Sequence, residues 1–204
     1  MKDTSGRFSP GNRAGDDLIF ACSPHSGGST DRAALMVAAA WERCGFSPGI
    51  VYLREYRVRF CLGCGQCAET GECVFQAEDD CRMLFEMLRS SHRLCFCAPI
   101  YFYHLPALLK AFIDRSQSVY NNPSGYWAQA AEEKPVASAV LLAGRKRGRS
   151  LFTGSEITLK YFLHLFGRKL RTLGLRGVET GADLRDVGGE NAYRIEEHVA
   201  GGRE

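Results

Sequence analysis

Residues 17–30, DLIFACSPHSGGST, begin as an apolar run and turn abruptly into a polar segment that contains two glycines. The apolar part, 17–22, has the composition of a buried strand, and the residues from Ser29 to Cys44 carry apolar side chains at helical spacing. Ser29 is the expected N-cap of that helix. A buried strand that leads through a short turn into an amphipathic helix predicts an α/β fold built on a parallel sheet.

The same alternation of strand and helix patterns continues along the chain. Further strands are expected at residues 50–53, 93–98 and 135–143, and in the segment after Arg176. Helices are expected from Asp79 and Asp80 onward, and over residues 106–118, 155–172 and 191–200. This spacing predicts helices on both faces of the sheet and ligands beyond the carboxyl ends of its strands. The loops 23–30, 99–104 and 143–155 would lie at that edge.

The composition is that of an ordinary globular domain. Of the 204 residues, 45% are hydrophobic and 24% are charged, and the formal net charge is +3. This charge is too small to indicate nucleic acid or a membrane as the main partner, and no apolar run reaches the length of a membrane span. Residues 1–16 are polar and lack the apolar region of a secretory signal. We therefore expect a cytoplasmic protein with a flexible extension at 1–16 and a single domain at 17–204.

The turn at residues 23–30, SPHSGGST, has the chemistry of a phosphate site. The N-terminus of a helix offers unpaired N–H groups and a partial positive charge, and the hydroxyl groups here add neutral donors. The segment lacks both the G-x-G-x-x-G pattern of dinucleotide sites and the lysine of a Walker loop. The residues alone leave two interpretations open: a loop for a mononucleotide phosphate, or an ordinary polar turn with a helix cap.

Three stretches together resemble the NADPH-dependent FMN reductase family of the flavodoxin-like superfamily. They are the 23–30 turn, the segment 98–102 (APIYF) and the helix pattern 109–115 (LKAFIDR). The similarity extends from about Asp17 to Phe166. It implies a flavodoxin-like three-layer sandwich, with a five-stranded parallel sheet in the order 2-1-3-4-5. It also implies FMN as the cofactor and NAD(P)H as a co-substrate.

The resemblance also implies which residues contact the flavin. The expected FMN-binding residues are Ser23, His25, Ser26, Gly28, Ser29, Thr30, Pro99, Ile100, Tyr101 and Phe102. Tyr101 and Phe102 suit the flat aromatic ring of a flavin, although aromatic residues in such a loop can also pack in a core or an interface. The chain departs from the family at His25 and Ser26, where family members often carry basic residues. It departs again at residues 144–149 (GRKRGR), in place of a glycine-rich loop.

Four of the nine cysteines form a compact motif. Cys61, Cys64, Cys67 and Cys73 give the spacing C-x2-C-x2-C-x5-C. This spacing resembles that of 4Fe-4S proteins, and its place after the second strand resembles that in iron–sulfur flavoproteins. Zinc is a second interpretation, and reduced thiols or a labile disulfide are a third. The remaining cysteines, Cys22, Cys44, Cys81, Cys95 and Cys97, are expected to be small core residues.

Taken together, these features predict an FMN-binding oxidoreductase of the NAD(P)H-dependent FMN reductase type, with an electron acceptor that the sequence leaves open. If the four cysteines hold a 4Fe-4S cluster, a ferredoxin-like carrier becomes the natural partner. The basic residues Arg145, Lys146, Arg147 and Arg149 are either part of a solvated loop or a surface that attracts an anionic partner. The alternative functions are a non-enzymatic electron carrier and a thiol-based or metal-binding sensor. The resemblance implies a homo-oligomer.

Overall fold

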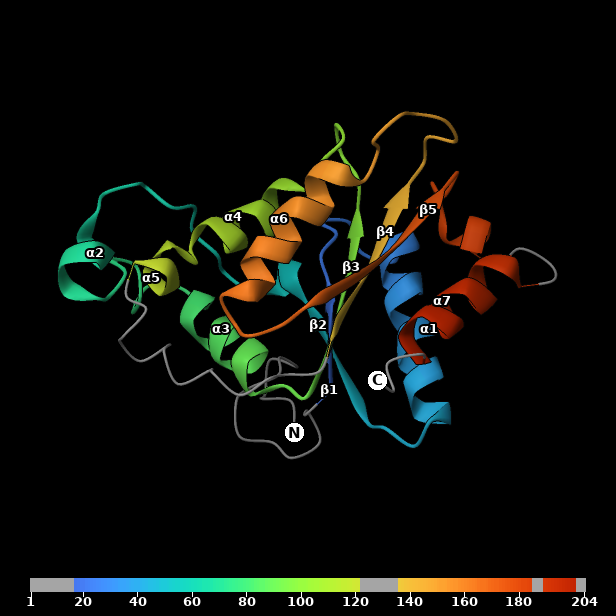
Figure 1. The fold of residues 1–204 in the computed structure, drawn as a ribbon, viewed down its shortest axis with the longest axis horizontal. Coiled ribbons are helices and arrows are strands. Elements are labelled where there is room, and N and C mark those ends of the chain that lie inside the picture. Colours follow the sequence, from blue (N-terminus) through green and yellow to red (C-terminus); the bar gives the residue numbers. More distant parts are fainter. Residues whose placement is uncertain (1–16, 122–135, 185–188, 201–204) are drawn as a thin grey trace.

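Five parallel strands form the centre of the structure, a computed structural model that describes residues 17–121, 136–184 and 189–200. The strands are β1 (Asp17–Ala21), β2 (Pro48–Tyr52), β3 (Arg93–Pro99), β4 (Ala137–Ala143) and β5 (Leu170–Arg176). They pair in the order β2-β1-β3-β4-β5, and every pairing is parallel. This is the predicted flavodoxin-like fold (Figure 1).

Helices cover both faces of the sheet, so the fold has three layers (Figure 1). One face carries α1 (Ser29–Arg43) and α7 (Glu190–Ala200), and the other carries α3 (Cys81–Ser90), α4 (Ala107–Asp114) and α6 (Thr153–His164). The shorter elements are η1 (Leu53–Glu55), α2 (Gln66–Thr70), α5 (Gln117–Tyr120) and η3 (Gly181–Leu184).

Successive side chains of the central strands point to opposite faces of the sheet, so they lie in two separate hydrophobic cores. Phe20 points into the core beneath α3, α4 and α6, while Ile19 points into the core beneath α1 and α7. Phe20 stacks on Phe96 and Phe112, with ring centroids 5.0 and 6.2 Å apart. Each fully buried apolar side chain of this size contributes roughly 1.5–3 kcal/mol, so this layer holds the carboxyl edge of the sheet in place.

The sequence interpretation was wrong at the last crossover. Residues 155–172 do not form one helix: α6 ends at His164, and β5 begins at Leu170 rather than after Arg176. Gly167 has a φ of 69°, a left-handed conformation typical of a helix end, and the Arg168 N–H donates to the Leu163 carbonyl. The short alternating run that follows then pairs with β4.

Three smaller expectations also need correction. The helical spacing over 155–172 predicts that Ile157 and Tyr161 face inward, but both are exposed, and the buried face of α6 carries Leu159, Phe162 and Leu163. The helix expected over 106–118 divides into α4 and α5. Cys44 is exposed, whereas the other four cysteines expected in the core are buried.

The expected extension at residues 1–16 lies outside the described residues. Among the residues that are described, every helix is too short or too polar to serve as a membrane span.

His198 makes stability depend on pH. Burial, and to a lesser extent the positive charge of Arg171, lowers the pKa of His198 from 6.5 to about 4. As the pH falls, the unfolded chain therefore takes up a proton at His198 before the folded protein does. The contribution of neutral His198 to the free energy of unfolding is fully present above pH 6.5 and is lost as the pH drops toward 4.

We expect His198→Gln to reduce this acid-dependent loss of unfolding free energy by about 1–3 kcal/mol, because the variant has no imidazole to protonate. Urea unfolding of both proteins across this pH range measures the effect. If the free energy of unfolding falls by the same amount with pH in the wild type and in His198→Gln, the lowered pKa is not that of His198.

Candidate functional site

Two adjoining cavities open at the carboxyl edge of the sheet, where the loops after β1, β3 and β4 meet. The first has a volume of about 280 Å³ and is lined by Ser23, His25, Gly28, Ser29, Thr30, Pro99, Ile100, Tyr101, Leu142, Gly144, Val178 and Glu179. The second has a volume of about 350 Å³ and is lined by Ile100, Tyr101, Phe102, Tyr103, Ala143, Gly144, Arg145 and Leu151. Because the two share Ile100, Tyr101 and Gly144, we treat them as one feature, the carboxyl-edge cleft.

Most of the expected flavin-site residues lie in this cleft. Ser23, His25, Gly28, Ser29, Thr30, Pro99, Ile100 and Tyr101 line the first cavity, and Phe102 lines the second. Ser26 lines neither cavity. The sequence interpretation missed Glu179, whose side chain borders the cleft so closely that a Cβ on Gly144 would come within 2.6 Å of its Cγ.

The first residues of α1 line the first cavity. Gly28, and not Ser29 as expected, is the N-cap, and no side chain caps the first turn. Gly27 has a φ of 73°, which lets the chain turn sharply into the helix. Thr30 is buried and Ser29 is half-buried, and both line the cavity. Free N–H groups beside two hydroxyls suit the binding of an anion.

A largely buried ion pair stabilises this turn. Both Arg54 Nη atoms lie 2.8 Å from the carboxylate of Asp31, and Asp31 Oδ2 also accepts a hydrogen bond from the Gly27 N–H at 2.8 Å. Arg54 comes from η1 and donates to Ser26 Oγ at 3.4 Å. This pair could not be predicted from the sequence, because its two members belong to elements that only the folded sheet brings together.

We expect Asp31→Asn to lower the free energy of unfolding by about 1–3 kcal/mol, because it leaves the largely buried Arg54 without its counter-charge. Asp114→Asn is the matched control. It breaks the exposed ion pair of Asp114 with Lys110, four residues earlier on α4, and should cost less than about 0.5 kcal/mol. Urea unfolding compares the two variants, and equal losses would refute a supporting role for the Asp31 pair.

The segment 101–104 forms a tight turn at the mouth of the cleft. Tyr101 and His104 exchange two backbone hydrogen bonds of 2.9 Å, and the residues between them, Phe102 and Tyr103, have φ angles of 48° and 65°. Such angles cost non-glycine residues roughly 1–2 kcal/mol each. The Phe102 side chain is fully exposed. The turn therefore stores strain while it presents an aromatic side chain beside the cleft.

Backbone pairing in this turn limits which groups can contact a ligand. The N–H of Ile100 donates to the Leu142 carbonyl, and that of Tyr101 donates to the His104 carbonyl. Of the stretch 100–102, only the Phe102 N–H has no acceptor in the described part of the chain. Phe102 is therefore the available backbone donor at this position.

The basic loop after β4 closes the other side of the cleft. Arg145 Nη1 donates to the Tyr103 hydroxyl at 3.4 Å, and the guanidinium lies 5.7 Å from the centroid of that ring. Arg145, Lys146 and Arg147 are exposed. Positive charge thus borders the part of the cleft that lies away from the start of α1.

The four motif cysteines surround a separate cavity of about 220 Å³. Its lining consists of Cys61, Leu62, Gly63, Cys64, Gly65, Cys67, Cys73, Val74, Phe75, Arg115, Gln117, Ser118 and Asn121. The segment that carries α2 forms one side and projects away from the carboxyl edge of the sheet, at the left of Figure 1.

Two N–H groups already donate to sulfur here: Gly63 N to Cys61 Sγ and Asn121 Nδ2 to Cys67 Sγ, both at 3.4 Å. A single zinc ion needs four ligands about 2.0–2.3 Å away. Among residues 17–121, 136–184 and 189–200, no three His, Cys, Asp or Glu side chains are grouped closely enough to hold one metal ion. A 4Fe-4S cluster binds each thiolate at a different iron, so its ligands stand further apart.

Sequence comparison relates the chain to flavoproteins. Residues 18–163 match the family described as NADPH-dependent FMN reductase. An iron-sulfur flavoprotein of Methanosarcina thermophila is 30% identical over 151 residues, which are 71% of this chain and 71% of that protein. An iron-sulfur flavoprotein of Archaeoglobus fulgidus is 28% identical over 102 residues, which are 50% of this chain and 46% of that protein. The match thus spans less than half the length of the Archaeoglobus protein.

Solved structures share the fold at low sequence identity. An NAD(P)H:quinone oxidoreductase from Methanothermobacter marburgensis has a TM-score of 0.64 and 17% identity, with 92% of this chain and 94% of that chain covered. An FMN-dependent NADH-azoreductase from Bacillus anthracis, in complex with FMN, has a TM-score of 0.59 and 13% identity, with 90% and 97% covered. At these identities the likeness establishes the fold alone.

Proposed function

Because the chain belongs to the NADPH-dependent FMN reductase family, we propose that it is an oxidoreductase that binds FMN in the carboxyl-edge cleft and reduces it with NAD(P)H. The main observation in support of this proposal is that three loops border the same cleft. The uncapped start of α1, the aromatic turn after β3 and the basic loop after β4 all border it.

The residues of the cleft suit the two ends of FMN. At the start of α1, free N–H groups and the hydroxyls of Ser29 and Thr30 would hold the phosphate. Ile100 and Tyr101, in the wall shared by the two cavities, would pack against the ring, and the Phe102 N–H would donate to its polar edge. Once bound, FMN supplies hydride acceptance and electron transfer, and the chain contributes binding and orientation.

The nicotinamide nucleotide would enter from the side of the basic loop. Arg145 is exposed, borders the second cavity and lies against Tyr103, so it can attract the phosphates of NAD(P)H without competing for the phosphate of FMN. Attraction of this kind is screened by salt, so the rate of flavin reduction should fall as the ionic strength rises.

We further propose that Cys61, Cys64, Cys67 and Cys73 hold a 4Fe-4S cluster. The support consists of the compact spacing, the shared cavity, the N–H donors at two of the sulfurs, and the two relatives named iron-sulfur flavoproteins. Such a cluster supplies one-electron transfer. A ferredoxin-like carrier would be the electron partner of such a cluster.

The remaining proposals concern the state of the protein in the cell. We propose a cytoplasmic homo-oligomer in which residues 17–204 form one FMN-binding domain. Apolar side chains exposed around the cysteine cavity favour a covered surface there: Phe60 is 69% exposed, Leu62 58% and Tyr120 65%.

The function is tested by mixing the FMN-loaded protein with NADPH or NADH in the absence of oxygen and following the flavin absorbance. We expect bleaching by at least one nucleotide, at a rate that falls with added salt. A flavin that dithionite reduces but neither nucleotide does would contradict an NAD(P)H-dependent enzyme. That result would favour an electron carrier.

A further inference from the structure

A buried arginine lies against the cysteine cavity. Arg115, which follows α4, is 3% exposed and lines the same cavity as the four motif cysteines. Its guanidinium carbon is 5.4 Å from the ring centroid of Phe75, another lining residue. A charged side chain at this depth is rare unless it is paired or has a function, so its contacts need an explanation.

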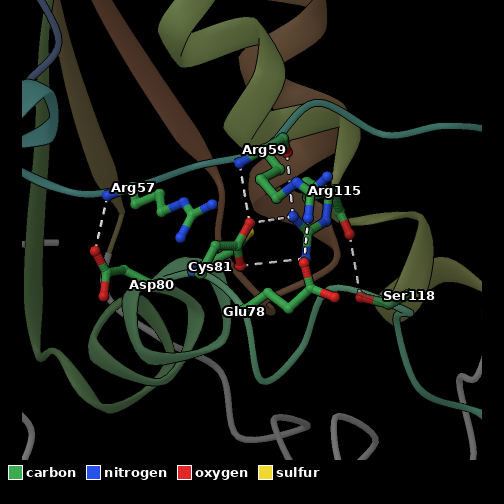
Figure 2. Close-up of polar contacts among 8 residues, drawn as sticks. Arg57, Arg59, Glu78, Asp80, Cys81, Arg115 and Ser118 are labelled. Atoms are coloured by element: carbon green, nitrogen blue, oxygen red, sulfur yellow. Dashed lines mark hydrogen bonds and ion pairs between the residues drawn. The ribbon is translucent and has the colours of Figure 1, made fainter.

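Arg115 is anchored on one side by a polar network (Figure 2). Its Nη1 donates to the Asp79 carboxylate and to the Arg59 carbonyl, the latter at 3.1 Å, while Asp79 also accepts the Arg59 N–H at 2.9 Å. The Ser118 hydroxyl donates to the Arg115 carbonyl at 3.1 Å. The network thus connects three segments: Arg59 precedes the cysteine motif, Asp79 precedes α3, and Arg115 lies between α4 and α5. These contacts hold the guanidinium in a fixed position.

The Nη2 of Arg115 also donates to the Asp79 carboxylate, at 3.4 Å, so one of the three guanidinium nitrogens is left without a hydrogen bond to the described residues. The Nε–H of Arg115 is buried and has no acceptor in the described part of the chain. A buried donor without a partner costs about 1–3 kcal/mol. The protein atoms of this network supply no acceptor for it, whereas sulfur in the adjoining cavity can accept a hydrogen bond.

We propose that Arg115 is a positioning residue of the cysteine centre, whose Nε–H donates to a sulfur in the cavity and, together with the Asn121 amide, raises the reduction potential of the cluster. This inference rests on the proposed 4Fe-4S cluster. Hydrogen bonds to the sulfurs of an iron–sulfur centre stabilise its more negative, reduced form and so raise its potential. Asn121 Nδ2 already donates to Cys67 Sγ at 3.4 Å. Arg115 would add a second side-chain donor from a position that solvent does not reach.

The test compares Arg115→Lys with the wild-type protein after anaerobic reconstitution. Lysine keeps the positive charge that Asp79 needs but lacks the Nε–H. The matched control is Arg168→Lys, because Arg168 is also 3% exposed and donates to backbone carbonyls, yet it does not line the cavity. The readouts are iron and sulfide per chain, followed by the midpoint potential of the cluster from an anaerobic dye titration.

We expect Arg115→Lys to lower the midpoint potential by the equivalent of at least a tenfold change in the reduced-to-oxidised ratio, about 59 mV for a one-electron couple. Asn121→Ala, at an exposed position with little effect on folding, should shift it in the same direction. Arg168→Lys should leave it unchanged. Iron-loaded protein whose potential is the same with Arg or Lys at position 115 would overturn this inference and leave the cluster intact. Wild-type protein that binds no iron would overturn both.

Discussion

Replacing Ser29 by aspartate is expected to raise the dissociation constant for FMN by at least about 100-fold, which corresponds to about 2.7 kcal/mol. Ser29 is the first residue of α1 and lines the cavity in which the phosphate would lie. A carboxylate there would oppose a phosphate that carries up to two negative charges. At about 6 Å and an effective dielectric constant of about 20, that repulsion reaches about 5 kcal/mol before salt screens it.

The same substitution should not harm the fold. A negative charge in the first turn of a helix interacts favourably with the helix dipole, so Ser29→Asp is expected to keep or raise the melting temperature of the flavin-free protein. Ser29→Asn is the matched control, since it has the size of aspartate without the charge, and it should weaken binding by less than about tenfold. Fluorescence titration of FMN measures all three proteins. Equal affinities of the Asp and Asn variants would place the phosphate elsewhere.

Replacing Cys73 by serine is expected to remove most of the iron from the anaerobically purified protein, from about four atoms per chain to fewer than about one. A hydroxyl is a poor ligand for the soft iron–sulfur centre, and among the described residues no cysteine beyond the four of the motif lines the cavity. FMN content should stay at the wild-type level, because the cysteine cavity and the carboxyl-edge cleft have no lining residue in common.

Cys44→Ser provides the control for this experiment. Cys44 is an exposed cysteine at the end of α1 and does not line the cysteine cavity, so its loss should leave the iron content unchanged. Iron and sulfide assays on parallel preparations give the comparison. A Cys73→Ser protein with the iron content of the wild type would contradict the assignment of Cys73 as a ligand.

The sheet and the loop before α1 could be predicted because their signals are local. The central strands are continuous apolar runs, and β1 passes directly through SPHSGGST into α1. The prediction for residues 155–176 was wrong because it also rested on a local signal, which was ambiguous there. The apolar residues of this segment fit a helical period and an alternating period equally well over a short window, and only pairing with β4 selects the strand at 170–176.

Contacts between distant segments could not be predicted. The Asp31–Arg54 pair depends on β1 and β2 lying side by side. The orphan donor of Arg115 depends on three segments meeting behind the cysteine cavity. Arg115 lies within the stretch LKAFIDR, where sequence alone shows only an ordinary charged residue after a helix. Such residues become visible only when burial and unpaired polar atoms are known.

The most direct test of the central claim is to purify the protein, release any bound flavin and measure its identity and its amount per chain, with FMN added back if none is retained. We predict FMN, not FAD, bound in equimolar amount, with a dissociation constant at least about 100-fold higher in Ser29→Asp. Protein that neither retains flavin nor binds added FMN would contradict the assignment of the carboxyl-edge cleft as a flavin site.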